Sequence, residues 1–353
     1  MDEKPSEKPV AAAGTTAKAA GAEPKGDGHG VMRDGSSADF PTDADGRVMH
    51  LQVRPGQLAN RVLSVGDAGR ARRIAEACFD GGRFAVHPST RGFGVYTGLF
   101  EGTPVSIVAT GMGTPMMDFV VREGTAVVRG ELAMVRLGTC GGLGHTRPGN
   151  VVVATKGLVL VRQEPDFVHA SEGSDDEAAA AAPAAAGLPM SPTRQVPYSI
   201  SRIVMPDAEL SEAFATAIDA QLQASKGSTS DISAYSVTRG SGATADSFYA
   251  SQGRINAIFD DRNETLVGEI EKRVPDAAAL EMESFHLISL AKASRGKLRA
   301  AAATIPLVSR ASGKWLDADH VRPLEIAGGR AAFAALSSMT LAGALAPAEL
   351  ELE

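Results

Sequence analysis

The stretch MVRLGTCGG at residues 134–142 is an apolar run, interrupted by one arginine, that ends in a glycine-rich turn. Two other runs have the same form: RVLSV at 61–65 precedes Gly66, and VSIVAT at 105–110 precedes Gly111. Longer stretches with helical patterns follow both of these runs. Short β-branched runs that end in glycine and lead into helices are typical of a wound α/β sheet. In such folds ligands gather beyond the carboxyl ends of the strands, so the sequence predicts a site there.

The composition is that of a folded protein with a sizeable core. Of 353 residues, 44% are apolar and 22% are charged, which is ordinary globular usage. With 35 Lys and Arg against 42 Asp and Glu the net charge is −7, so there is no global basic field to attract nucleic acid or a membrane surface. The 38 glycines argue against an all-helical bundle. Cys78 and Cys140 show neither disulfide-rich nor metal-ligand spacing, so we expect no metal site.

The chain divides into a tail and one domain with an insertion. Residues 1–45 are rich in Pro, Lys, Glu, Gly and Ala and are expected to be disordered. A single domain is expected at 46–350, with a flexible low-complexity insertion at about 171–196. The uncharged stretch 331–348 has an Ala- and Ser-rich composition that favours a buried helix over a membrane span. The N-terminus has no apolar region like that of a signal peptide, so we expect a cytoplasmic protein.

Two of the glycine-rich turns have an arginine close by. Arg70 lies one helical turn after Gly66, and Arg136 lies two residues before Gly138. Glycine lets backbone N–H groups approach an anion, and arginine supplies a forked positive charge, which suggests a phosphate or carboxylate site. Either arginine alone also fits a surface position, but Arg136 interrupts an apolar run, where an unpaired charge is costly. No P-loop or dinucleotide-binding glycine motif occurs, which disfavours a dinucleotide-dependent oxidoreductase.

Two further clusters carry polar groups that suit a nucleoside. In FYASQGR at 248–254, Gln252 offers a donor and an acceptor side by side and Arg254 adds donors, a set that could read the edge of uracil. A polar loop after an aromatic pair is the alternative. In LEMES at 280–284, two carboxylates flank a methionine and could bind vicinal hydroxyls or a metal. The acidic first turn of a helix is the alternative there.

Taken together, these segments resemble the nucleoside phosphorylase family and, within it, the uridine phosphorylases. The matching elements, in order between His50 and Ala348, are GDxxR at 66–70, TGMG at 110–113, RLGTxG at 136–141, FYxxQxR at 248–254 and EME at 281–283. The resemblance implies an α/β domain with a mixed, barrel-like central β-sheet flanked by helices. It also implies a homo-oligomer, either a dimer or a trimer of dimers, with active sites shared between subunits. The implied reaction converts uridine and inorganic phosphate reversibly to uracil and ribose 1-phosphate, with no cofactor.

The resemblance assigns a role to each matching position. The implied phosphate-binding set is Gly66, Arg70, Arg136, Thr139 and, from a partner subunit, Arg91. The implied ribose contacts are Met282, Glu283 and, from a partner subunit, His50. The implied base-binding set is Gly141, Phe248, Gln252, Arg254 and Arg310. Of these residues, Arg136, Arg254 and Glu283 are expected to act in catalysis.

Two departures from the family pattern bear on specificity and metals. Purine-specific relatives use an aspartate on a late strand to protonate the base, and this chain has Ser309 there, which favours a pyrimidine. Where bacterial members can carry a glutamate that helps to bind an interface cation, this chain has Gly92, so no such ion is expected. A purine or broad-specificity phosphorylase and a non-catalytic nucleoside-binding protein are the alternatives.

Overall fold

The computed structural model describes residues 39–164 and 197–352. Most of the tail expected at 1–45 and all of the insertion expected at 171–196 lie outside these described residues. Within residues 39–45, Thr42 forms an antiparallel bridge with Val48, and the Asp43 carboxylate accepts the backbone N–H groups of Asp45 and Arg47. A hydrogen-bonded turn therefore precedes the domain boundary expected at residue 46.

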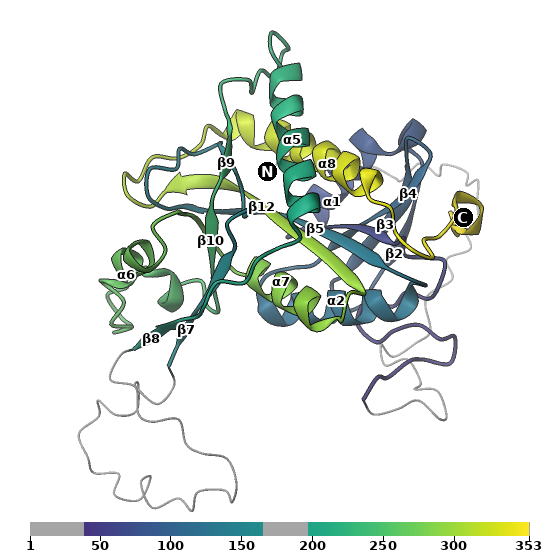
Figure 1. The fold of residues 1–353 in the computed structure, drawn as a ribbon, viewed down its shortest axis with the longest axis horizontal. Helices are drawn as coiled ribbons and strands as arrows, with labels where there is room; N and C mark the ends of the chain where they lie inside the picture. Colours follow the sequence, from purple (N-terminus) through teal and green to yellow (C-terminus); the bar gives the residue numbers. More distant parts are fainter. Residues whose placement is uncertain (1–38, 165–196, 353) are drawn as a thin grey trace, which may run out of the picture.

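A twelve-stranded mixed sheet forms the centre of the molecule (Figure 1). The longest run of parallel pairing consists of β4 (Thr103–Ala109), β1 (Arg61–Val65), β5 (Leu132–Gly142) and β12 (Leu298–Ser309). Beyond β4 the sheet continues with the antiparallel strands β3 (Gly94–Phe100) and β2 (Phe84–Pro88). Nearly every residue of β1, β4 and β5 is buried, as expected for parallel strands that are covered on both faces.

The strand pairing returns on itself and gives the sheet its barrel-like form. Past the end of β5 follow β11 (Ala277–Glu281), β10 (Ser241–Ala245), β7 (Leu158–Gln163) and β8 (Tyr198–Ile200). Along its other edge β5 pairs with β12, which pairs with β6 (Val151–Val153), which pairs with β9 (Val237–Arg239). Only Gly240 separates β9 from β10, so the circuit of pairing closes there. The mixed, barrel-like α/β domain expected from the resemblance is confirmed.

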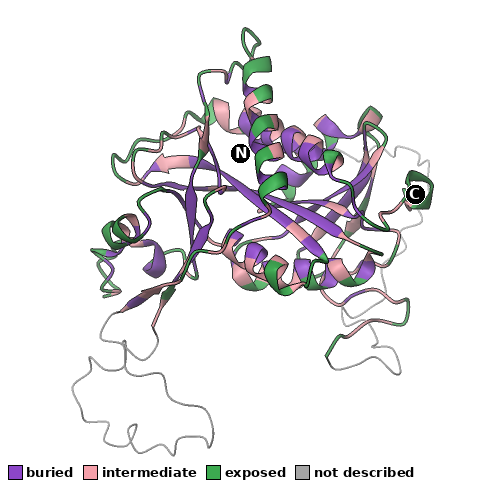
Figure 2. Ribbon diagram, in the orientation of Figure 1, coloured by how far each residue is buried: buried purple, intermediate pink, exposed green. Residues whose placement is uncertain are grey.

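Helices cover both faces of the central strands (Figure 1). One face carries α1 (Ala68–Cys78), α5 (Ala208–Ala224) and α8 (Ala318–Ser338), and the other carries α2 (Thr114–Val127) and α7 (Ser284–Ala293). Side chains of β5 alternate between the two cores: Val135 and Leu137 belong to the first, and Met134 belongs to the second. Figure 2 shows the buried centre that results. The remaining helical segments are α6 (Leu266–Arg273), η1 (Asp80–Gly82), η2 (Ala250–Gln252) and η3 (Pro347–Glu349).

The uncharged stretch at 331–348 begins inside α8. Phe333 and Leu336 in this helix are fully buried in the first core, and the helix ends at Ser338. The buried helix expected from the composition is therefore present over residues 331–338. Among the helices in the described part of the chain, none is long and apolar enough to cross a bilayer.

Candidate active site

A cavity of about 350 Å³ opens where the ends of four strands meet. β5 and β12 run parallel and end side by side, and β11 meets the end of β5 in an antiparallel pairing. β1 ends beside Leu137, five residues before the end of β5. The volume lies within the usual range for small-molecule pockets, roughly 300–1,000 Å³. The cavity is also extended, because Arg136 and Gly141 both line it and five residues of a strand span roughly 16 Å.

Most of the residues expected to bind substrates line this cavity. From the expected phosphate set these are Gly66, Arg70, Arg136 and Thr139. From the expected ribose set they are Met282 and Glu283, and from the base set they are Gly141, Phe248, Gln252 and Arg254. Three expected residues, His50, Arg91 and Arg310, are not among those that line it.

Arg70 is fixed at the start of α1. Asp67 caps this helix by accepting the backbone N–H of Arg70, so the turn after β1 directs the Arg70 side chain under the sheet. There the Arg70 Nε donates to Glu325 of α8 at 2.7 Å, and its Nη1 donates to the Leu137 carbonyl at 3.3 Å. Arg73 donates to the second oxygen of Glu325 at 2.7 Å. A buried carboxylate thus holds the Arg70 guanidinium in one position at the wall of the cavity.

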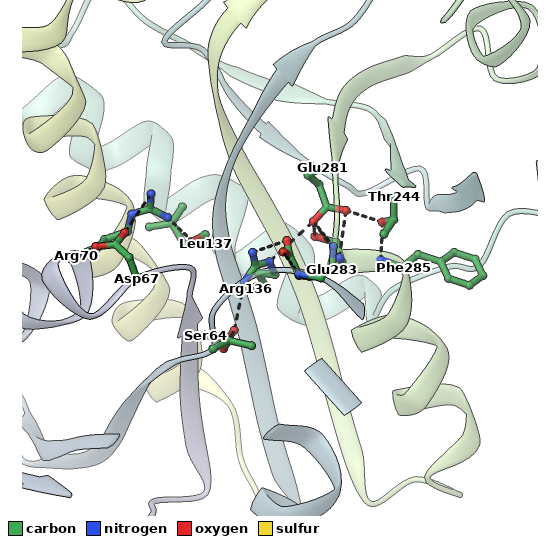
Figure 3. Close-up of polar contacts among 12 residues, drawn as sticks. Ser64, Asp67, Arg70, Arg136, Leu137, Thr244, Glu281, Glu283 and Phe285 are labelled. Atoms are coloured by element: carbon green, nitrogen blue, oxygen red, sulfur yellow. Dashed lines mark hydrogen bonds and ion pairs between the residues drawn. The ribbon is translucent and has the colours of Figure 1, made fainter. Parts of the chain in front are cut away.

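Arg136 lies at the centre of the strand ends (Figure 3). Its Nη2 is 2.5 Å from a Glu283 oxygen, its Nη1 donates to the Ser64 hydroxyl at 3.4 Å, and its Nε is 3.8 Å from Glu281. The residue is 3% exposed, so the charge that interrupts this apolar strand is paired, as its position in the sequence requires. A Cβ on Gly138 would lie 3.6 Å from Arg136 Nε, an ordinary contact distance, so Gly138 lies directly against the guanidinium.

The two carboxylates follow the end of β11. Glu283 Oε1 accepts the backbone N–H of Gly113 at 2.6 Å, which connects the turn before α2 to the same site. Glu281 Oε2 accepts the backbone N–H groups of Glu283 and Ser284, both at 2.9 Å, and Oε1 accepts the Thr244 hydroxyl. Burial and the neighbouring Glu283 charge raise the pKa of Glu281, while Arg136 opposes this shift.

Phe248, Gln252 and Arg254 lie on a loop that contains η2, in which Phe248 is exposed and Gln252 is buried. The Arg254 guanidinium is 4.0 Å from the centre of the Phe248 ring, a cation–π contact. Its Nε donates to the Phe248 carbonyl at 3.1 Å, and its Nη2 donates to the Gln252 side-chain oxygen at 3.4 Å. Burial lowers the pKa of Arg254. The loop therefore presents a guanidinium and a buried amide next to each other, although they belong to no regular strand.

Arg310 supports this loop from the end of β12. Its Nη2 donates to the Gly253 carbonyl at 3.0 Å. A Cβ on Gly141 would lie 3.1 Å from the Arg310 side chain, so glycine at that position lets the arginine cross β5. Burial and the charge of Arg254 lower the pKa of Arg310. Arg310 thus holds the loop that carries Arg254, and contact with a base stays a prediction.

His50 and Arg91 lie next to each other, away from the cavity of their own chain. His50 Nδ1 is 2.6 Å from Glu123, and its ring stacks on Phe119 with centroids 3.8 Å apart. The Ser89 hydroxyl donates to the His50 carbonyl and accepts the backbone N–H of Arg91. The two residues assigned to a partner subunit thus share one surface, and their role there stays a prediction.

Several residues of the site were not assigned from the sequence. Asp67, Met112, Cys140, Glu281 and Trp315 also line the cavity. Asp67, Met112 and Glu281 belong to the matching motifs and could have been found there, whereas nothing in the sequence pointed to Trp315. Burial raises the pKa of the Cys140 thiol to about 12, so the thiol is protonated and unreactive at neutral pH. Across residues 39–164 and 197–352, no group of three or more acidic, His or Cys side chains could hold a metal ion.

Comparison with known proteins identifies the family. The sequence matches the Phosphorylase superfamily over residues 60–327, from the start of β1 into α8, and the chain belongs to this superfamily. It is similar to a solved structure from a study of two uridine phosphorylases of the oomycete Phytophthora capsici. The identity is 39% and the TM-score is 0.77, over 88% of this chain and 100% of that chain.

Curated relatives include enzymes of both base specificities. A DeoD-type purine nucleoside phosphorylase of Roseobacter denitrificans is 33% identical over 32% of this chain and 47% of its own length. A uridine phosphorylase of Thermococcus kodakarensis is 27% identical over 37% of this chain and 46% of its own length. The chain thus spans about half the length of the curated relatives that it matches. Membership of the family therefore supports nucleoside phosphorolysis without deciding the base.

Proposed function

We propose that this protein is a uridine phosphorylase that converts uridine and phosphate reversibly to uracil and ribose 1-phosphate, in pyrimidine salvage in the cytoplasm. The observation that carries the proposal is that one cavity contains two arginines, a buried glutamate and a Gln–Arg pair. The arginines suit phosphate, the glutamate suits vicinal sugar hydroxyls, and the Gln–Arg pair suits the carbonyl and N–H edge of uracil. The 39% identical Phytophthora capsici structure supports the same reaction.

The geometry supports a mechanism that depends on position and charge. Arg70 and Arg136 would hold phosphate beneath the sugar, in line with the bond that breaks between C1′ and N1. Glu283 would accept hydrogen bonds from the ribose hydroxyls. As negative charge develops on the leaving uracil, the hydrogen bonds from Gln252 and Arg254 would strengthen, so they favour the transition state over the ground state. No step in this scheme requires a metal or an organic cofactor.

The base-binding loop favours a pyrimidine over a purine. The carboxylates that line the cavity are Asp67, Glu281 and Glu283, which lie at or just after the ends of β1 and β11. β12 ends at Ser309 and continues into Arg310, so the end of this strand carries no acid to protonate a purine ring nitrogen. Purine phosphorolysis is the second candidate, because the DeoD-type relatives share the fold family.

Release of uracil from uridine, followed by ultraviolet absorbance with and without inorganic phosphate, tests the proposal. Inosine and cytidine serve as parallel substrates. We expect phosphate-dependent release from uridine and at least a 10⁴-fold preference over cytidine, whose amino group would meet the arginine donors. Release from inosine alone would keep the phosphate site and overturn the proposed base specificity. No release from any nucleoside would favour a nucleoside-binding protein without catalytic activity.

We further propose that the active site is completed across a subunit boundary, in a dimer or a trimer of dimers. His50 and Arg91 share one surface and lie outside the cavity of their own chain, which supports a contribution to the site of a partner. Inactive Arg91→Ala chains mixed with inactive Arg136→Ala chains should then regain partial activity, because some sites would combine intact halves. Absence of recovery under conditions of demonstrated subunit exchange would argue for sites within one chain.

A further inference from the structure

Glu281 organises the turn that presents Glu283 to the cavity. In addition to the two backbone N–H groups, its Oε2 accepts the Ser284 hydroxyl at 2.8 Å, while Oε1 accepts the Thr244 hydroxyl. The residue is 4% exposed. Four donors on one buried carboxylate stabilise its ionised form. They also fix the backbone of Glu283, which carries the proposed ribose acceptor.

The charges around Arg136 do not balance. In the described structure, Arg136 is the one cation paired with both Glu281 and Glu283, so this group has a net charge of −1. Its Nε is buried and makes no hydrogen bond among the described residues. The ion pairs around Arg70 add no net positive charge to the site. The two cations Arg70 and Arg73 are balanced there by the two carboxylates of Asp67 and Glu325. A phosphate dianion that enters between these groups therefore meets no excess of positive charge, even when a partner subunit adds Arg91, and this is unfavourable at low dielectric.

We infer that binding of the phosphate co-substrate is accompanied by uptake of one proton from solvent, which Glu281 holds, while Glu283 stays available as the acceptor for the ribose hydroxyls. The inference rests on the proposed function, because it requires an oxyanion at Arg136. Glu281 is thus a positioning residue that also adjusts the charge of the site. The proton returns to solvent when the anion leaves.

The surroundings of Glu281 support this assignment. The titratable or charged groups that face it are Arg136 and Cys140 of β5 and Glu283 before α7, and the Cys140 thiol is neutral. Burial and Glu283 already raise the pKa of Glu281, and Arg136 holds it down. An oxyanion that takes hydrogen bonds from Arg136 adds a negative charge and weakens that opposing effect, so the pKa of Glu281 rises further.

Calorimetric titration with sulfate measures the uptake directly. Sulfate has the shape of phosphate but remains a dianion near neutral pH, so any proton taken up belongs to the protein. The full chain is titrated between pH 5.5 and 9 in two buffers with different heats of ionisation, and the difference in heat gives the protons bound. We expect an uptake that approaches one proton within this range and a sulfate affinity that falls as pH rises. Binding without proton uptake at every pH would overturn the inference and leave the proposed function intact.

Failure of the phosphate site itself would give a different result. If neither sulfate nor phosphate produces heat, and neither changes the fluorescence of Trp315 at the cavity wall, the inference and the proposed phosphate site are both wrong. The two failures are therefore distinguishable.

Two variants identify the group that takes up the proton. Thr244→Val and Ser284→Ala each remove a hydroxyl that donates to Glu281 and is not part of the cavity wall. Because the ionised form loses a hydrogen bond, each change should move the range of proton uptake upward by about one pH unit. Thr97→Val, which removes a buried hydroxyl on β3, is the matched control and should leave the range unchanged.

His50 is the competing proton acceptor if it reaches the anion from a partner subunit. Proton uptake that disappears in His50→Gln and does not shift in Thr244→Val or Ser284→Ala would assign the proton to that histidine. This result would overturn the inference. Proton uptake that persists in His50→Gln and shifts in either hydroxyl variant would support it.

Discussion

The two ends of the cavity are built in different ways. At the strand end, Arg70 and Arg136 are 7% and 3% exposed and are held by buried carboxylates. At the loop end, Phe248 and Trp315 are 45% and 73% exposed, and Arg254 is held by a carbonyl oxygen and a ring face. Groups proposed to bind phosphate are thus tied to the core of the fold. The groups proposed to read the base lie on a loop whose outer residues are exposed, although Gln252 within it is 3% exposed.

The largest effect is expected at the strand end. Arg136→Ala should lower kcat/KM by about 10³-fold and remove the dependence on phosphate. It should also destabilise the fold by about 3–5 kcal/mol, because Glu281 and Glu283 lose the cation that they share. Steady-state kinetics over a range of phosphate concentrations and thermal unfolding measure the two effects.

Arg136→Lys separates catalysis from folding at this position. Lysine keeps the charge but not the forked donor geometry, so stability should largely recover while kcat/KM stays about 10²-fold low. A lysine variant with full activity would show that charge alone suffices and that the bidentate geometry is not used.

At the loop end we expect a smaller loss of activity, which affects uridine and leaves phosphate binding and stability nearly unchanged. Arg254→Ala should lower kcat/KM for uridine by about 10²-fold, with the phosphate KM unchanged within about twofold and little change in stability, because the side chain lies on a loop. Arg147→Ala is the matched control, since Arg147 also lies over an aromatic ring, that of Tyr235 at 5.2 Å, and does not line the cavity. A change in phosphate KM as large as that in uridine KM for Arg254→Ala would mean that the two ends do not act separately.

The smallest effect is expected at the rim of the cavity. Trp315 is the only tryptophan in the chain, so its fluorescence should change when uracil or uridine binds. Trp315→Phe should abolish that signal, raise the uridine KM by only about two- to threefold, and alter stability by less than about 0.5 kcal/mol. A fluorescence titration and steady-state kinetics test this together. A tenfold rise in KM would place Trp315 among the groups that bind the base.

The residues at the strand end of the cavity could be predicted from the sequence, but the residues that hold them in place could not. Glycines after apolar runs and an arginine inside one pointed to Gly66, Arg70 and Arg136 because turn chemistry and the cost of a buried charge are local properties. Glu325 could not be found in this way, since it meets Arg70 across a separation of 255 residues. In the sequence it resembles any polar position on a helix, and only the packing of α8 against α1 shows that it is buried.

The closure of the sheet also could not be predicted from local sequence patterns. β5 pairs with β1 along its first half, with β11 at its last two residues and with β12 along its whole length. Apolar runs predict that such strands exist, but not which edges they share. Gln252 and Arg254 were assigned through the family resemblance, because the polar loop that carries them has no periodicity that would mark it as a site.

The pairing of β5 with β12 has a consequence for how the protein is made. Arg136 emerges from the ribosome about 160 residues before the strand that covers its edge, which runs from Leu298 paired with Leu132 to Ser309 paired with Gly142. Contacts so distant in sequence form late and slowly. During translation one edge of the charged strand β5 therefore stays unpaired until β12 has been made. A nascent chain that ends before β12 lacks one wall of the cavity.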